Sequence, residues 1–89
     1  MWQGKRALIT GASAGIGAAF AKKLAAEGVH LVITARREER LEALASELKS
    51  TYDIEVHVLT ADLASFDGPV VVENFLKAEK LEIDILINN

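Results

Sequence analysis

A glycine-rich turn near the amino terminus constrains the fold of this chain more than any other feature. Gly11, Gly15 and Gly17 follow a short apolar run at residues 7–10 and open a stretch with helical periodicity. A strand that passes through such a turn into a helix typically begins a βαβ unit, with the helix amino terminus directed at a phosphate group. The turn therefore predicts a parallel α/β sheet and a ligand that carries phosphate.

Apolar runs and helical repeats alternate along the rest of the chain. The runs that read as strands lie at residues 7–10, 29–34, 54–59 and 83–87, and helical patterns follow the first three, beginning near residues 16, 38 and 67. This βαβαβαβ order predicts a doubly wound parallel sheet of the Rossmann type with strand order 3-2-1-4. The first two helices should cover one face of the sheet, and the third helix the other.

The apolar patterns also predict which faces are buried. In the first helix Ile16, Phe20 and Leu24 recur at i, i+4 and i+8, and we expect them to form its buried face. The strand at 83–87 is almost entirely apolar, so we expect both of its faces to be buried. Because the strand order places it at the sheet edge, we expect residues 1–89 to be the first part of a larger single domain, ending after its fourth strand.

The composition argues against several classes of protein. The 89 residues are 51% hydrophobic, which predicts a packed core, and the net charge of −3 gives no reason to expect a nucleic-acid partner. Without cysteine there is no disulfide, thiolate metal site or thiol nucleophile, and no other metal-ligand cluster is visible. No apolar run approaches the roughly 18 residues of a membrane span, so we expect a cytoplasmic protein without a membrane partner.

The glycine turn has a specific chemical interpretation. Gly11 allows the tight turn out of the strand, Gly15 leaves room for phosphates, and Gly17 lets the helix pack closely on the sheet. The helix amino terminus adds N–H donors and roughly half a positive charge, and Ser13 and Ile16 should supply main-chain or hydroxyl contacts. An ordinary strand-to-helix turn is the alternative, but the surrounding βαβ unit favours a dinucleotide.

Ordered motifs along the chain resemble those of the short-chain dehydrogenase/reductase family. The Thr-Gly-x-x-x-Gly-x-Gly spacing of residues 10–17 is that family's form of the glycine fingerprint. Asp62 and Leu63 follow the third strand, where the family places an aspartate against the adenine amino group. Asn88 and Asn89 close the fourth strand, where the family has Asn-Asn-Ala-Gly. The resemblance implies the NAD(P)-binding portion of an oxidoreductase that moves hydride between nicotinamide and a carbonyl or alcohol substrate.

The end of the second strand indicates which dinucleotide is preferred. An acidic residue about 20 positions after the glycine turn would bind the ribose 2′-hydroxyl of NAD, but Thr34 and Ala35 are not acidic. Arg36 and Arg37 follow, and a guanidinium binds a 2′-phosphate through paired, charge-assisted hydrogen bonds. The sequence therefore favours NADP(H) over NAD(H), although Ala14 stands where some NADP-preferring relatives carry a basic residue. Alternatively, both arginines are solvated, although cations at a helix start oppose its dipole.

Two further candidate contacts belong to the adenosine end of the site. Asp62 either binds adenine, as the resemblance implies, or caps the loop before the third helix; its place after a strand, on the ligand side, favours adenine. Asn88 would meet the adenosine portion through its main chain or side chain. The expected cofactor contacts are thus Gly11, Ser13, Ala14, Gly15, Ile16, Gly17, Arg36, Arg37, Asp62, Leu63 and Asn88.

No catalytic residue is expected within the chain. In the resembled family the proton donor is a tyrosine four residues before a lysine, and here Tyr52 is followed four residues later by Val56. His30 and His57 have no serine or carboxylate partner at a useful spacing. We therefore expect the cofactor-binding part of an NADP-dependent oxidoreductase or, alternatively, a non-catalytic nucleotide-binding module. Self-association along the fourth strand would stabilise the non-catalytic module, and a homo-oligomer is a candidate partner for this chain.

Overall fold

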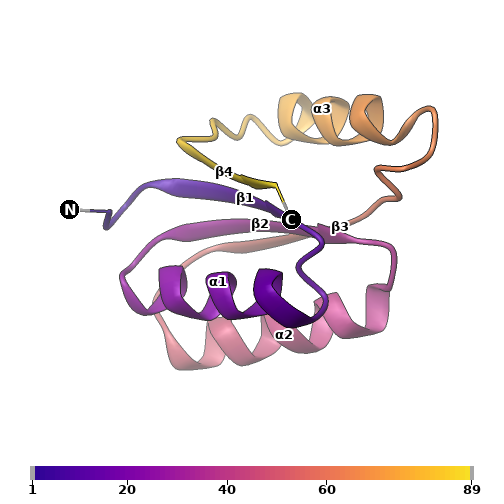
Figure 1. The fold of residues 1–89 in the computed structure, drawn as a ribbon. Helices are drawn as coiled ribbons and strands as arrows, with labels where there is room; N and C mark the ends of the chain where they lie inside the picture. The colour runs from indigo at the N-terminus through magenta and orange to yellow at the C-terminus, as the bar shows by residue number, and fades with distance from the viewer. Residues whose placement is uncertain (1, 89) are drawn as a thin grey trace.

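Strands and helices alternate along the whole of the part that the computed structural model describes, residues 2–88. The expected βαβαβαβ order is confirmed (Figure 1). Asn89, which the sequence places in a motif with Asn88, lies outside the described residues. The elements are β1 (Arg6–Thr10), α1 (Gly15–Ala26), β2 (His30–Ala35), α2 (Glu38–Thr51), β3 (Val56–Thr60), α3 (Gly68–Ala78) and β4 (Ile85–Asn88).

The strands form one parallel sheet in the order β3-β2-β1-β4, as predicted. Thr10, the last residue of β1, pairs in register with Thr34 of β2 on one side and with Asn88 of β4 on the other. Because all strands run the same way, their carboxyl ends meet at one edge of the sheet. That edge is where a doubly wound fold places its ligand.

Helices cover the sheet from both sides, as expected. Figure 1 shows α1 and α2 together on one side and α3 alone on the other. The larger core lies under α1 and α2, and α2 contributes its buried face of leucines and alanine at i, i+3, i+4 and i+7 spacing, namely Leu41, Leu44, Ala45 and Leu48. No helix within residues 2–88 is long and apolar enough to cross a bilayer.

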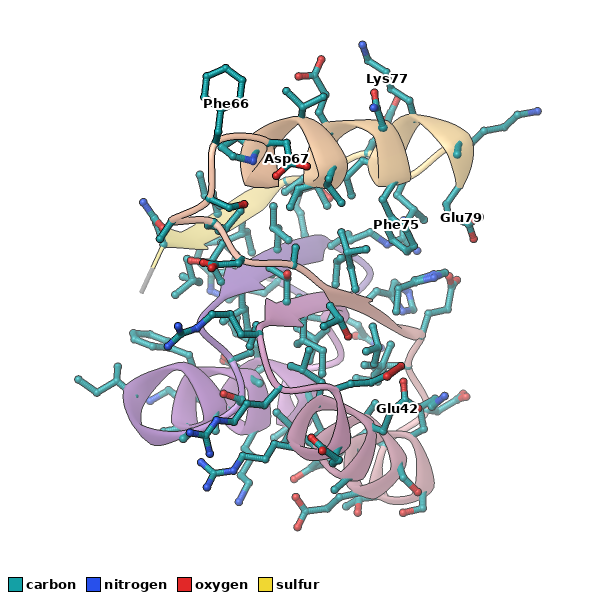
Figure 2. The ribbon with its side chains drawn as sticks, turned by 90° about the vertical axis from the view of Figure 1, so that its right-hand side faces the viewer. Glu42, Phe66, Asp67, Phe75, Lys77 and Glu79 are labelled. Carbon is teal, nitrogen blue, oxygen red and sulfur yellow. The ribbon has the colours of Figure 1, made fainter. Side chains whose placement is uncertain are left out.

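The smaller core lies under α3. Val72 of this helix is buried against Leu8 and Val32 of the sheet. Phe75 points from α3 toward the sheet, where its ring meets the His57 ring edge-on at 6.5 Å, whereas Phe66 before the helix points away from the molecule (Figure 2). The core under α3 therefore has fewer fully buried side chains than the core under α1 and α2, and partly buried apolar side chains surround it.

The predicted buried face of α1 was wrong for Ile16 and Phe20, whereas Leu24 packs partly against the larger core as expected. Ile16 and Phe20 are 67% and 41% exposed, and the residues buried against the sheet are Gly17, Ala21 and Ala25. This set also has i, i+4 and i+8 spacing, so its period matches a helix equally well. Small residues let the helix backbone lie close to the sheet, and the bulkier side chains are displaced toward solvent.

The expectation that β4 is buried on both faces was also wrong. Ile85 and Ile87 pack partly against the larger core, but Leu86, on the opposite face, is 62% exposed. The helix on that side, α3, packs on Leu8 and Val32 and leaves Leu86 uncovered. An apolar sequence indicates that a strand can be buried, but whether each face is buried depends on which element packs over it.

The opposite edge of the sheet, where the strands begin, carries a group of charged side chains. The Arg6 guanidinium forms an ion pair with Glu55 at 2.9 Å, and the same carboxylate lies 3.4 Å from His57 Nε2. The Glu55 backbone N–H donates to His30 Nδ1 at 3.0 Å. The sequence analysis expected no carboxylate partner for His57, and this expectation was wrong. Glu55 is that partner, because side chains two residues apart lie on the same face of an extended segment.

Candidate functional site

A cavity of about 420 Å³ opens at the carboxyl edge of the sheet. It lies where β1, β2 and β4 end, beside the loop that follows β3. Thr10, Thr34, Ala35, Ala61 and Ala64 form part of its wall and were not expected as contacts. The structure also brings most of the predicted contacts together around this cavity: Gly11, Ser13, Arg36, Arg37, Asp62, Leu63 and Asn88.

The glycine turn forms the side of the cavity next to α1. Gly11 and Gly15 have φ of 64° and 61°, in the left-handed region that glycine adopts without steric cost. The Ala12 backbone N–H donates to the Thr34 carbonyl at 3.2 Å, which ties the turn to β2. A Cβ added at Gly15 would meet no atom within 4 Å, so the space beside this backbone is open. A phosphate group could approach the main chain there.

Three predicted contacts lie at the start of α1 outside the cavity wall. Ala14 is the residue that precedes the helix, and within residues 2–88 no side chain caps the first turn of α1. Ile16 is mostly exposed, and Gly17 is buried toward the sheet. The N–H groups of this first turn therefore have no side-chain acceptor among the described residues and can serve an anion.

A hydrogen bond between side chains joins β1 to β4 at the cavity floor. Thr10 Oγ1 donates to Asn88 Oδ1 at 2.9 Å. The Asn88 side chain is thereby held beside the turn, although it lies on the edge strand. Asn88 lies at the end of the fourth strand, as the sequence indicated. Its partner Thr10 was recognised in the sequence only as part of the glycine motif.

The loop after β3 is organised around Asp62. Its carboxylate Oδ1 accepts from the Ala64 backbone N–H at 3.0 Å, and its carbonyl accepts from the Ser65 N–H at 3.0 Å and the Ser65 hydroxyl at 2.7 Å. The loop-capping role considered as an alternative is therefore present. Within residues 2–88, the second carboxylate oxygen has no hydrogen-bond partner.

Gly68 packs against the backbone of this loop, and sequence reasoning did not identify it as part of the site. It is the first residue of α3 and is buried. A Cβ at Gly68 would lie 2.8 Å from the Leu63 Cα and would also collide with the Asp62 carbonyl. The Asp-Gly-Pro sequence indicated a helix start correctly, but it carried no sign that the glycine packs against the loop.

Arg36 and Arg37 stand exposed at the mouth of the cavity. Arg37 precedes the first residue of α2, and both side chains line the cavity together with Ser13. Within residues 2–88 neither guanidinium forms an ion pair, even though Glu38 and Glu39 follow directly. The described residues include no group of three histidines or carboxylates that could hold a metal ion. The arrangement offers cations and main-chain donors, which suit an anionic ligand.

Comparison with known proteins points to one family. The family model described as short chain dehydrogenase matches residues 5–89. A very-long-chain 3-oxoacyl-CoA reductase of Candida albicans is 40% identical over 90 residues, which cover 97% of this chain and 25% of that protein. A 7beta-hydroxysteroid dehydrogenase of Mediterraneibacter gnavus is 39% identical over 83 residues, covering 93% of this chain and 31% of that protein.

Solved structures agree with this assignment. L-sorbose reductase from Gluconobacter frateurii, complexed with NADPH and L-sorbose, matches with a TM-score of 0.91 and 39% identity over 98% of this chain and 33% of that chain. A short-chain dehydrogenase from Sphingobium yanoikuyae in complex with NADPH matches with a TM-score of 0.83 and 43% identity over 92% of this chain and 32% of that chain. The chain thus spans between a quarter and a third of these relatives' lengths. Since the family model matches nearly all of it, the chain belongs to the short-chain dehydrogenase family.

Proposed function

We propose that this chain binds NADP(H) as the cofactor-binding part of an oxidoreductase that acts on a carbonyl or alcohol substrate. The observation that carries the proposal is one cavity that joins the glycine turn, two arginines that form no ion pair within residues 2–88, and the Asp62 loop. The NADPH complexes of two similar structures support it. When bound, the nicotinamide supplies the hydride chemistry, and the residues of this chain bind and orient the cofactor.

The turn and the start of α1 would hold the pyrophosphate. The backbone beside Gly15 borders open space, so a phosphate can approach without meeting a side chain. The uncapped first turn of α1 offers N–H donors and the positive end of the helix dipole. In this proposal Ala14, Ile16 and Gly17 contribute through their main chain, which agrees with their position outside the cavity wall.

The loop after β3 and the end of β4 would hold the adenosine. Asp62 uses one carboxylate oxygen inside the loop, so the other is available to accept from the adenine amino group. Leu63 and Ala35 give the cavity apolar wall that suits the faces of a base. Asn88, fixed by Thr10, would meet the adenosine from the opposite strand. In this proposal residues 1–89 belong to a single nucleotide-binding domain.

Arg36 and Arg37 would distinguish NADP(H) from NAD(H). A 2′-phosphate at the cavity mouth would find two guanidinium groups that have no ion-pair partner within residues 2–88. No carboxylate stands at the end of β2 to accept from a 2′-hydroxyl, because that position is Ala35. The preference therefore depends on these two cations.

A binding comparison tests the proposal. NADPH and NADH are titrated into the chain by calorimetry, for the wild type, for the double variant Arg36→Gln/Arg37→Gln, and for Lys23→Gln as a control that removes a cation at the far end of α1. We expect the double variant to bind NADPH at least about tenfold more weakly while its NADH affinity changes little. Equal wild-type affinities for the two cofactors, or tighter NADH binding, would contradict the proposed preference.

A further inference from the structure

The ring of His30 holds the backbone immediately before β3. Its Nδ1 accepts a hydrogen bond from the Glu55 N–H at 3.0 Å, and the Leu31 N–H donates to the Glu55 carbonyl at 2.9 Å. The first two residues of β2 therefore bind both backbone groups of Glu55. Since β3 lies at the edge of the sheet and pairs there with β2, these two bonds fix the point at which β3 begins to pair.

The contact with Glu55 determines where the His30 ring can carry a proton. A backbone N–H can only donate, so Nδ1 must present a lone pair, and the neutral ring keeps its proton on Nε2. A protonated imidazole carries an N–H at both ring nitrogens. A proton gained at Nδ1 would therefore remove this hydrogen bond and set two N–H groups against each other.

His57 contacts the same residue but should respond to a proton in the opposite way. Its Nε2 lies 3.4 Å from Glu55 Oε1, so a positive charge on this ring would strengthen the contact with the carboxylate. Its ring also meets Phe75 of α3 edge-on. The two histidines thus hold Glu55 through contacts with opposite dependence on pH, and only the His30 contact requires a neutral ring.

The charged groups around His30 would not compensate for the lost hydrogen bond. Arg6 pairs in register with His30 on β1, and its positive charge opposes a second cation beside it. The Glu55 carboxylate would attract a cation, but it is 59% exposed and already lies 2.9 Å from the Arg6 guanidinium. Asp84, before β4, is also exposed and accepts from the Arg6 backbone N–H at 2.9 Å. Exposed charges attract each other weakly in water, so the loss of the direct bond dominates.

We propose that His30 is a pH-sensitive latch, which holds the amino end of β3 while its ring is neutral and releases it when Nδ1 gains a proton. Imidazole groups as a class change charge between about pH 5 and 8, so release belongs to mildly acidic pH. The release is local, because the chain just after β3 keeps its own bond to β2, from the Ala61 N–H to the Ala35 carbonyl at 3.0 Å. The latch lies at the amino edge of the sheet and does not depend on what the cavity at the carboxyl edge binds.

Two NMR measurements on the wild-type chain test the latch. A long-range ¹H–¹⁵N spectrum of the His30 ring at about pH 8 should show the proton on Nε2 and none on Nδ1. Amide exchange is then followed down to about pH 5, and each rate is divided by that of an unstructured peptide at the same pH. We expect the protection of the Glu55 and Leu31 amides to fall about three- to tenfold, while that of Ala61 changes less than about twofold.

Two variants assign the effect to one ring. His30→Asn keeps an acceptor in place of Nδ1 but has no group that titrates in this range, and His57→Gln is the matched control that removes the other imidazole. Protection of the Glu55 amide should stay constant within about twofold in His30→Asn and should still fall in His57→Gln. The ring spectrum needs no variant, so it decides even if His30→Asn does not fold.

Four results would overturn the latch. One is a proton on Nδ1 of the wild-type ring at about pH 8, and another is a loss of Glu55 protection in His30→Asn as large as in the wild type. Disappearance of that loss in His57→Gln would place the switch on His57 instead. An equal fall at Ala61 would show that the whole chain opens and that no local release takes place.

Discussion

Thr10 and Thr34 are paired in register on neighbouring strands, yet of their two hydroxyls only that of Thr10 has a side-chain hydrogen-bond partner within residues 2–88. Thr10 Oγ1 donates to Asn88 Oδ1 at 2.9 Å. Thr34 is fully buried, and its Oγ1 has no hydrogen-bond partner within residues 2–88. A buried polar group without a partner costs free energy, whereas a satisfied one contributes modestly. The same hydroxyl therefore has opposite energetic consequences on the two strands.

Thr10→Val should destabilise the chain. The substitution keeps the shape of the side chain but removes the donor that joins β1 to β4. We expect the free energy of unfolding to fall by about 1 kcal/mol, measured by urea denaturation. NADPH binding should also weaken, because Asn88 loses the bond that holds it beside the cavity. Unchanged stability would show that this hydrogen bond contributes nothing.

Thr34→Val should have the opposite effect on stability and serves as the matched partner of that experiment. It removes a buried hydroxyl that has no partner among the described residues and leaves an apolar group of similar volume. We expect the free energy of unfolding to rise by about 1 kcal/mol in the same urea titration. A loss as large as that of Thr10→Val would mean that the Thr34 hydroxyl is hydrogen-bonded after all.

Gly68→Ala should disturb the loop that carries Asp62. The added Cβ would lie 2.8 Å from the Leu63 Cα, and a backbone atom cannot give way as the end of a side chain can. We expect the free energy of unfolding to fall by about 1–3 kcal/mol and NADPH affinity to fall with it. The control is Val70→Ala on the same helix, whose side chain is 55% exposed. If both variants bind NADPH like the wild type, packing at Gly68 does not position the loop.

The stability of the chain should depend on pH through Glu55. Its hydrogen bond with the His57 ring, together with the nearby Arg6 guanidinium, holds the pKa of the Glu55 carboxyl below its ordinary value of 4.5. A carboxyl with a lowered pKa in the folded state contributes stability above the unfolded pKa, and this contribution is lost as the pH falls through the folded pKa. We therefore expect part of the stability to disappear as the pH falls below about 4.5.

The variant Glu55→Gln isolates this contribution. The free energy of unfolding is measured by urea denaturation at a series of pH values from neutral to acidic. Glu55→Gln should be less stable than the wild type near neutral pH, and the difference should shrink toward acidic pH. Glu42→Gln on α2 removes a carboxylate outside this cluster and is the control (Figure 2). A difference that stays constant over the whole pH range would exclude the Arg6–Glu55–His57 cluster as its source.

The order of the elements and the glycine turn could be predicted because both signals are local. A period of two or of 3.6 residues and a glycine motif between them are visible without knowing what packs where. The burial of β4 was not predictable in this way. Leu86 is as apolar as a buried strand requires, but it stays exposed because α3 rests on Leu8 and Val32 instead.

The arrangement of the candidate site was predictable to the same extent as that of the fold. Gly11, Arg36 and Asp62 follow directly from motifs at strand ends, and the parallel sheet brings such ends to one edge. The contact of Gly68 with the Asp62 loop depends on how closely α3 lies to that loop. Such distances are set by tertiary packing, and the sequence pattern does not state them.

The buried face of α1 provides the last prediction. Ala21 is fully buried under the helix, whereas Ile16 is 67% exposed, although the sequence favoured Ile16 as the core residue. Ala21→Leu adds volume where the helix meets the sheet and should lower the free energy of unfolding by about 1–3 kcal/mol. Ile16→Ala should stay within about 0.5 kcal/mol of the wild type, because an exposed side chain gains little from burial. Urea denaturation of both variants measures the contrast. If Ile16→Ala costs the 2–5 kcal/mol that is typical of a core isoleucine while Ala21→Leu is tolerated, the helix packs by the face that the apolar pattern first suggested.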